Sequence, residues 1–202
     1  MTALSLLLVV SAYLIGSLMG ALIVNRLFQV ADPRQSGSGN PGASNMLRNY
    51  GKWAGFLTLF IDVIKGIVPV ATALFLQQPE WVLGVTGVAA LLGHIFPLYY
   101  GFSGGKGVAT ALGIFSVFSL KIASGLLCIW IVIFALSRYS SLASLSATLA
   151  APILTYYFVP TFFVPVIVMS FFIFLKHKDN VNRLCRGKEF RFSVKETKKT
   201  SN

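Results

Sequence analysis

Long apolar runs separated by short polar stretches dominate the chain. The first three runs cover residues 3–28, 53–76 and 81–100. Each is long enough to cross a membrane, because about 20 apolar residues in an α-helix span roughly 30 Å of hydrocarbon. In the whole chain, 55% of the residues are hydrophobic and 11% are charged, and the mean hydropathy is +0.75. A soluble domain does not have this composition, so the pattern predicts membrane-spanning helices.

Two further apolar runs, 107–138 and 141–175, are too long for one crossing each. Polar residues within 119–125 can interrupt the first run, and the segment from Pro160 to Pro165 supplies a turn in the second. If both runs are divided, the fold class is all-α, a polytopic integral membrane helical bundle with seven transmembrane helices. Five crossings are the alternative, if each run is a single tilted helix.

Basic residues set the orientation of this bundle. With seven spans, 15 of the 17 Lys and Arg residues lie on one side of the membrane. They occur in or beside the segments 29–52, 101–106 and 138–140 and in the chain from residue 176 onward. The opposite side has Lys121 alone. By the positive-inside rule the basic side is cytoplasmic and the N-terminus lies outside.

The excess of positive charge also indicates the partners. The net charge is +11, and in the loops of a membrane protein it suits anionic lipid headgroups and anionic substrates better than nucleic acid. Residues 1–202 are expected to form one transmembrane domain, with a basic cytoplasmic tail over about 190–202. Lys195, Lys198 and Lys199 in this tail are interpreted as anchors to membrane lipids.

The first cytoplasmic loop contains the motif SGSGNPGASNMLR, residues 36–48. Its glycines, with neighbours such as Gly39 and Asn40, permit a positive-φ backbone whose N–H groups converge on an anion. Residues 43–48 are predicted to form a short helix with its N-terminus toward that anion. A flexible surface turn is the alternative, but Arg48 favours an anion site because its guanidinium binds phosphate bidentately.

A second glycine-rich loop, GFSGGKGVAT, covers residues 101–110. It partly matches a nucleotide-binding P-loop, but Gly107 stands where that motif needs Ser or Thr. Gly104, Gly105, Lys106 and the start of the following helix can still cradle a phosphate. A glycine hinge with a snorkelling lysine is the plainer alternative. The phosphate cradle is preferred because both glycine-rich loops lie on the same face.

Three ionisable residues lie within predicted spans, where an unpaired charge is costly. Asp62 and Lys65 are three residues apart on one helical face, so we expect a structural ion pair beneath the site. His94 is expected to have a structural role more than a chemical one.

Polar residues also gather after the last span and before the sixth. His177, Asn180 and Glu189 follow the last span with hydrogen-bonding groups that simple anchoring does not require. Ser141, or failing that Ser144, can donate to phosphate oxygens, although small residues at helix contacts are the alternative.

Together, the motifs GSGNPGASNMLR, DVIKG, GHIFPLYYGFSGGKGVAT and HKDNVNRLCRGKE resemble those of the bacterial acyl-phosphate-dependent glycerol-3-phosphate acyltransferases. The resemblance covers nearly the whole chain. It implies transfer of a fatty acyl group from acyl phosphate to the sn-1 hydroxyl of glycerol-3-phosphate, which yields lysophosphatidic acid. It also implies seven spans, no acyl-CoA donor and supply of acyl phosphate by a soluble enzyme. We expect no cofactor or metal, and a place in the bacterial inner membrane.

The resemblance also assigns roles to residues. Its essential serine and arginine fall on Ser38 and Arg48, its third-motif histidine and asparagine on His177 and Asn180, its glutamate on Glu189, and its phosphate loop on Gly104, Gly105, Lys106 and Gly107. We add Gly39, Asn40 and Ser141 as phosphate-binding residues, and Asp62, Lys65 and His94 as supporting residues.

The expected mechanism is direct attack of the glycerol hydroxyl on the acyl carbonyl, because the chain lacks a nucleophile elbow and a His-x4-Asp pair. Lys106, Arg48 and Ser38 would hold phosphate, and the acyl tail would lie in a groove between spans. The proton acceptor is either His177 or the donor phosphate. A transporter of an organic phosphate is the competing class, but transporters need polar access from both sides.

Overall fold

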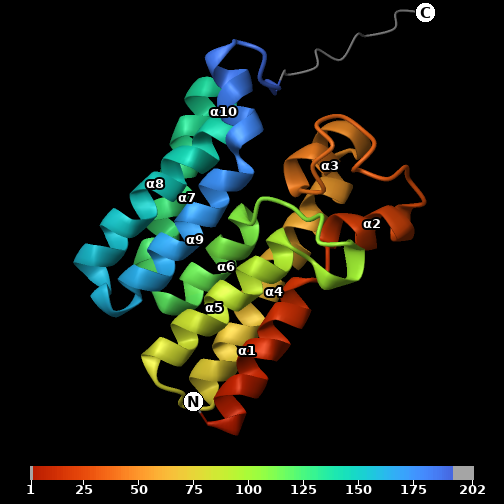
Figure 1. The fold of residues 1–202 in the computed structure, drawn as a ribbon. Coiled ribbons are helices and arrows are strands. Elements are labelled where there is room, and N and C mark those ends of the chain that lie inside the picture. The colour runs from red at the N-terminus through yellow and green to blue at the C-terminus, as the bar shows by residue number, and fades with distance from the viewer. Residues whose placement is uncertain (1, 193–202) are drawn as a thin grey trace, which may run out of the picture.

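The computed structural model describes residues 2–192, and within this range every regular element is helical (Figure 1). The predicted lipid anchors Lys195, Lys198 and Lys199 lie outside the described residues. The α-helices are α1 (Ala3–Gly16), α2 (Gly20–Phe28), α3 (Ala43–Tyr50), α4 (Lys52–Phe75), α5 (Glu80–Ile95), α6 (Val108–Phe118), α7 (Leu120–Ser137), α8 (Ser140–Phe158), α9 (Phe163–Lys176) and α10 (Lys178–Cys185), with 3-10 turns η1 (Leu98–Tyr100) and η2 (Pro160–Phe162).

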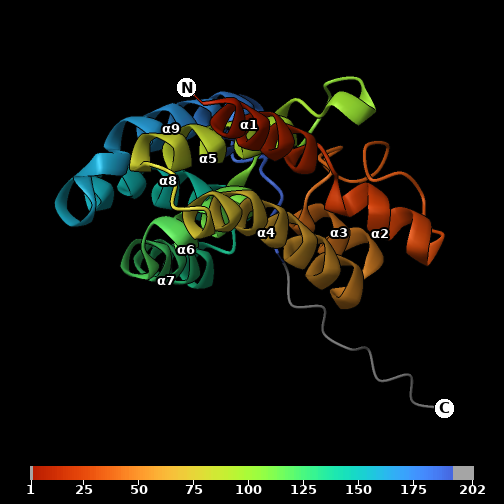
Figure 2. The same ribbon diagram turned by 90° about the horizontal axis from the view of Figure 1, so that it is seen from below.

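The long helices pack in two layers. Figure 2 shows α1, α5 and α9 side by side in one layer and α4, α6 and α7 in the other, with α8 closing one side. Glycines allow the backbones to approach closely where the helices cross. A Cβ atom on Gly16 of α1 would collide with the backbone of Ala90 in α5, and one on Gly66 of α4 would collide with Thr110 in α6.

The two longest apolar runs are divided where the sequence predicts. Ser119 has an extended backbone and separates α6 from α7, and the turn η2 separates α8 from α9. Within the described residues, four helices are long and apolar enough to cross a membrane, and two bent helix pairs raise this to six; α6 is a shorter apolar helix. The α3 and α10 helices lie at the end of the bundle opposite the N-terminus (Figure 1).

The first predicted span, residues 3–28, is not one continuous helix. It bends by 43° between α1 and α2. A buried ion pair satisfies the backbone groups that this break frees, as a membrane interior requires. The Lys65 ammonium donates to the Leu18 carbonyl at 2.5 Å, and the Gly20 amide donates to Asp62 at 3.3 Å. Asp62 and Lys65 are themselves 2.9 Å apart, so the ion pair expected from their spacing also holds this bend.

The regular helix in the third predicted span is shorter than the predicted range of residues 81–100. The α5 helix ends at Ile95, and η1 follows. Pro97 explains this end, because a proline disfavours the helical conformation in the residue before it and has no N–H group to donate.

Candidate active site

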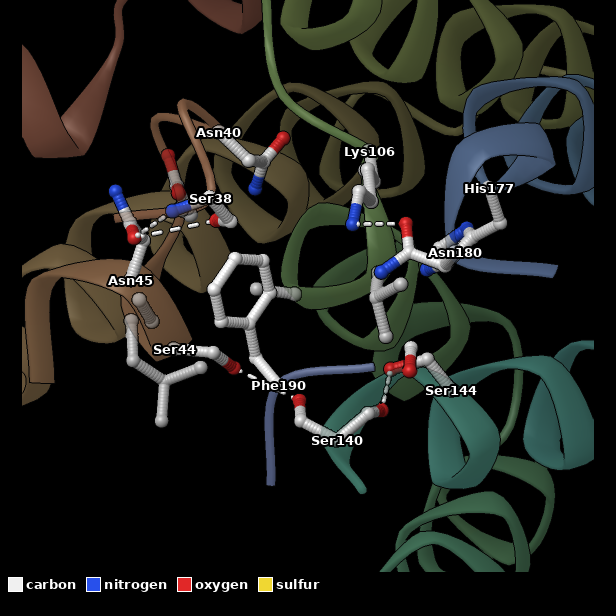
Figure 3. A pocket seen from close by; sticks show the side chains of 18 of the residues that line it. Ser38, Asn40, Ser44, Asn45, Lys106, Ser140, Ser144, His177, Asn180 and Phe190 are labelled. Atoms are coloured by element: carbon white, nitrogen blue, oxygen red, sulfur yellow. Dashed lines mark hydrogen bonds between the residues drawn. The ribbon is translucent and has the colours of Figure 1, made fainter. Parts of the chain in front are cut away.

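A polar pocket lies where the first loop, the glycine loop and several helices meet (Figure 3). It brings together residues from the first loop, α3, α4, α5, the glycine loop, α6, α7, α8, the turn before α10, α10 and the segment after α10. Of the residues predicted from sequence, it contains Ser38, Asn40, Arg48, Asp62, His94, Lys106, Gly107, Ser141, His177, Asn180 and Glu189. Gly39 and Gly104 line an adjoining outer hollow. Lys65 lies beneath the pocket, and Gly105 is buried against His94.

Asn45 organises the first loop. It lies in α3, the short helix predicted for residues 43–48, and is 1% exposed. Its side-chain oxygen accepts hydrogen bonds from the Ser38 amide at 3.0 Å and hydroxyl at 3.2 Å. Its amide nitrogen donates to the carbonyls of Pro33 and Ser36. Gly37 and Gly39 have φ values of 58° and 68°, so the loop has the positive-φ backbone expected of an anion nest.

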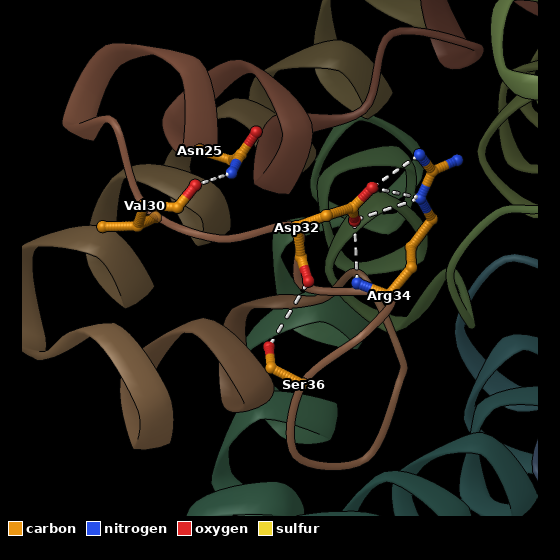
Figure 4. A network of polar contacts seen from close by, with 5 residues as sticks. All are labelled: Asn25, Val30, Asp32, Arg34 and Ser36. Carbon is orange, nitrogen blue, oxygen red and sulfur yellow. Dashed lines mark hydrogen bonds and ion pairs between the residues drawn. The ribbon is translucent and has the colours of Figure 1, made fainter.

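Further contacts brace the outer part of this loop (Figure 4). Arg34 and Asp32 form an ion pair of 2.7 Å, and hydrogen bonding to Arg34 lowers the pKa of Asp32. The Ser36 hydroxyl donates to the Asp32 carbonyl, and the Asn25 side chain donates to the Val30 carbonyl. The loop is therefore held in place before it reaches Ser38.

The glycine loop lies directly on His94. The Gly105 amide donates to the His94 carbonyl at 3.2 Å, and a Cβ atom on Gly105 would collide with the imidazole. The same imidazole is 3.2 Å from the Thr110 hydroxyl and 3.6 Å from Asp62. His94 thus connects the buried Asp62–Lys65 pair to the loop that carries Lys106, which is a structural role.

Lys106 extends from this loop toward α10, where its ammonium donates to the Asn180 side-chain oxygen at 2.5 Å. Burial lowers the pKa of Lys106 to about 8; Glu189 opposes this shift, and the charges of Arg183 and Arg48 add to it. Lys106 therefore carries a positive charge that is partly removed from water, where its attraction for an anion is strengthened.

Glu189 is the centre of the hydrogen bonding at α10. One of its oxygens accepts from Asn180 at 2.7 Å and from Ser141 at 3.0 Å, and the other accepts from Arg183 at 2.8 Å. The Ser141 hydroxyl, predicted to donate to phosphate, thus donates to this carboxylate. Ser144 donates to the Ser140 carbonyl.

His177 is 2% exposed in the turn between α9 and α10. Burial and the charge of Lys106 lower the pKa of His177 to about 4, so the imidazole is neutral at pH 7. Its Nδ1 lies 2.8 Å from the Ile173 carbonyl. A carbonyl only accepts, so Nδ1 carries the proton and Nε2 keeps a lone pair that can accept from a substrate hydroxyl.

Arg48 lies close to two aromatic rings and lines the pocket. Its guanidinium carbon is 5.0 Å from the centre of the Phe190 ring and 5.1 Å from that of Phe192. Residues 190–192 belong to the expected basic cytoplasmic tail, and the structure places Phe190 in the lining of the pocket. The aromatic residues of this segment are the sequence signal that could have indicated its contact with Arg48. Asn45 lies inside the first-loop motif but is not among the predicted site residues.

An apolar pocket shares the Leu59, Val108 and Trp130 walls with the polar one. It continues between α6, α7, α8 and α9, where Phe115 and Ala151 line it. The Trp130 indole N–H donates to Ser144 at 3.1 Å, and Trp130 lines both pockets where they adjoin. Within residues 2–192, no group of three His, Cys, Asp or Glu side chains is arranged to hold a metal ion.

The fold and the site define a class of protein. A bundle of apolar helices carries a basic pocket at one end and an apolar pocket beside it, which suits an amphiphilic molecule with an anionic group. Comparison with known proteins gives the family. The sequence profile described as glycerol-3-phosphate acyltransferase matches residues 6–187, and the chain belongs to this family.

Relatives and solved structures agree over nearly the full length. The glycerol-3-phosphate acyltransferase of Photobacterium profundum is 45% identical over 98% of both chains, and that of Idiomarina loihiensis is 48% identical over 95% of this chain and 98% of its own. Two crystal structures of PlsY, an integral membrane glycerol 3-phosphate acyltransferase, have 40% sequence identity to this chain and cover 94% of it. Its glycerol 3-phosphate form has a TM-score of 0.89 over 96% of that chain, and its lysophosphatidic acid form has 0.87 over 95%.

These comparisons confirm the resemblance read from the motifs. The chain is an acyltransferase and a multi-pass membrane protein of phospholipid synthesis.

Proposed function

We propose that this protein transfers a fatty acyl group from acyl phosphate to the sn-1 hydroxyl of glycerol-3-phosphate, with lysophosphatidic acid and phosphate as products. One observation carries the proposal: the basic pocket and the apolar pocket meet at the wall formed by Leu59, Val108 and Trp130. Charged phosphates and a fatty acyl chain can therefore occupy adjoining sites, with the reacting carbonyl where the sites meet. The ligands named for the two PlsY structures are the corresponding substrate and product.

The phosphate groups would be held from two sides of the polar pocket. Lys106 supplies a charge on one side, and Arg48 and Ser38 supply donors on the other. The backbone of Gly39 and Asn40 adds the nest beside Ser38, and the glycine loop adds the N-terminus of α6. Such fixed donors stabilise the negative charge that develops as the phosphate leaves.

The glycerol moiety would lie against α10. The free Nε2 of His177 accepts from a hydroxyl, and Asn180 helps to orient the same group. The hydroxyl oxygen attacks the acyl carbonyl carbon, and the bond from that carbon to the phosphate oxygen breaks. A pKa of about 4 makes His177 a weak base at pH 7. The leaving phosphate, which keeps the bonding electrons, is therefore the better acceptor for the proton.

The proposed arrangement in the membrane follows from the same features. We propose seven crossings, in which α1 with α2 forms the first, α6 and α7 are separate, and α8 and α9 are separate. The positive charge then places the N-terminus outside and the active site on the cytoplasmic side of the bacterial inner membrane. Acyl phosphate, which is made in the cytoplasm, would reach the site from a soluble enzyme.

The test uses the purified protein with labelled glycerol-3-phosphate, given palmitoyl phosphate or palmitoyl-CoA in parallel. We expect labelled lysophosphatidic acid from palmitoyl phosphate alone. Product from palmitoyl-CoA alone would contradict the proposal that acyl phosphate is the donor. No product from either donor would contradict the proposed acyl transfer. Proteoliposomes without a donor provide a separate measurement, since uptake of labelled glycerol-3-phosphate would support the transporter class instead.

A further inference from the structure

An aromatic side chain lines the polar pocket, where polar and charged groups surround it. Phe190 lines the pocket (Figure 3), and it belongs to the short segment of residues 187–192 that follows α10. This segment extends past residue 187, where the family match ends. We call it the aromatic clasp, because both of its phenylalanine rings lie within cation–π distance of the Arg48 guanidinium.

The clasp is fixed at both ends. At one end, Glu189 accepts hydrogen bonds from Ser141, Asn180 and Arg183. At the other, the Phe192 amide donates to the Arg138 carbonyl at 3.0 Å. The Phe192 ring also contacts Phe134 edge to face at 5.3 Å, and Phe134 in turn stacks on Trp130 at 4.9 Å. The two rings near Arg48 are therefore held by α7, α8 and α10.

Arg48 is held without being neutralised. Its Nη1 donates to the Phe190 carbonyl at 3.4 Å, and no salt bridge to Arg48 occurs among residues 2–192. The nearby Glu189 carboxylate binds Arg183 instead. A carboxylate on Arg48 would compete with a phosphate for the same donors, whereas an aromatic face attracts the guanidinium and leaves its edge free.

We propose that Phe190 and Phe192 are positioning residues that hold Arg48 for the anionic part of a substrate. The inference rests on the proposed function, in which Arg48 binds phosphate. The clasp orders a long side chain before the substrate arrives, so binding does not have to supply that order. The contribution should therefore appear mainly as substrate affinity.

The test compares Phe190→Leu and Phe192→Leu with the wild type in kcat and KM for glycerol-3-phosphate and for palmitoyl phosphate. We expect KM for at least one of the two substrates to rise about tenfold for Phe190→Leu, with kcat changed less. Phe190→Tyr keeps the aromatic face and should recover most of that loss. Phe75→Leu, at a ring that is 85% exposed at the end of α4, is the matched control.

A double-mutant cycle separates positioning from a general structural effect. If Phe190 acts through Arg48, then Phe190→Leu should change KM little in the Arg48→Met background, which has no cation to hold. Equal effects in both backgrounds would overturn the inference, as would unchanged KM values in both leucine variants. If Phe190→Leu does not fold, Phe192→Leu and the tyrosine variant carry the test. Absence of lysophosphatidic acid from the wild type would instead overturn the proposed function.

Discussion

The two pockets that meet at Trp130 are built in different ways. The polar pocket takes its key groups from three segments far apart in the sequence, at Ser38, Lys106 and Asn180, and each is fixed by a specific hydrogen bond. The apolar pocket is formed by helix faces and is lined mainly by apolar side chains such as Phe115 and Ala151, without a charged group. One pocket depends on individual donors, and the other depends on volume.

This difference predicts which measured quantity each pocket controls. Removing a buried donor leaves its partner unsatisfied and weakens binding of charge. Filling an apolar space excludes part of a chain and leaves the chemistry intact. Substitutions in the polar pocket should therefore change turnover for every donor, and those in the apolar pocket should change the preferred acyl length.

The largest effect is expected from Lys106→Met. The substitution keeps much of the side-chain length and removes the charge beside Asn180. We expect kcat/KM for glycerol-3-phosphate to fall by about 10² to 10³, as for loss of one preorganised donor to a developing anion. Initial rates with saturating palmitoyl phosphate measure this.

Lys121→Met is the matched control, because Lys121 lies near the start of α7, at the other end of that helix from the pocket. Its kinetics should equal those of the wild type. A Lys106→Met enzyme with unchanged kcat/KM would show that the phosphate cradle does not include this lysine.

The next effect concerns the buried ion pair of Asp62 and Lys65 beneath the polar pocket. Asp62→Asn should destabilise the protein by about 3–5 kcal/mol, because it leaves Lys65 as an uncompensated buried charge. Thermal unfolding in detergent measures the loss. The double variant with Lys65→Met should recover much of it, although the Leu18 carbonyl then loses its donor. A single variant as stable as the wild type would show that the ion pair does not support the bend between α1 and α2.

Most of the polar pocket could be predicted from the sequence because its residues occur in short motifs whose chemistry is local. Glycine-rich loops that precede a helix N-terminus and carry a basic residue favour a phosphate site, and this signal can be read from a short stretch of sequence. The bend in the first span could not be predicted, because Asp62 and Lys65, which stabilise it, lie more than 40 residues away in the chain. The sequence predicts Ser141 as a donor to phosphate for the same reason, since its partner Glu189 becomes a neighbour only in the fold.

The apolar pocket was predicted only as a groove between spans. Ala151 and Phe115 are indistinguishable by composition from the lipid-facing residues around them, and only packing shows which face is enclosed. The aromatic clasp was missed because its basic neighbours indicated a tail at the membrane surface.

Ala151→Phe tests the apolar pocket. The alanine is 1% exposed on α8, and a phenyl group there would occupy space that an acyl chain needs. We expect activity with palmitoyl phosphate to fall about tenfold, since each excluded CH₂ costs about 0.8 kcal/mol, while a shorter donor such as octanoyl phosphate keeps its activity. Leu149→Phe, on the exposed face of the same helix, is the control. Equal losses with both donors would mean that Ala151 does not border the acyl site.

The smallest effect is a pH dependence that belongs to the polar pocket alone. The pKa of Lys106 is about 8, so its charge is present below that value and is lost above it. Between pH 7 and pH 8.5 the charged fraction falls about fourfold, while a phosphate monoester, with a second pKa of about 6, remains a dianion. KM for glycerol-3-phosphate should therefore rise about fourfold, and Lys106→Arg should flatten the rise because a guanidinium stays charged. The same rise in the arginine variant would assign the titration to another group. An acyl-length preference that stays constant across this pH range would show that the apolar pocket does not depend on the charge that the polar pocket loses.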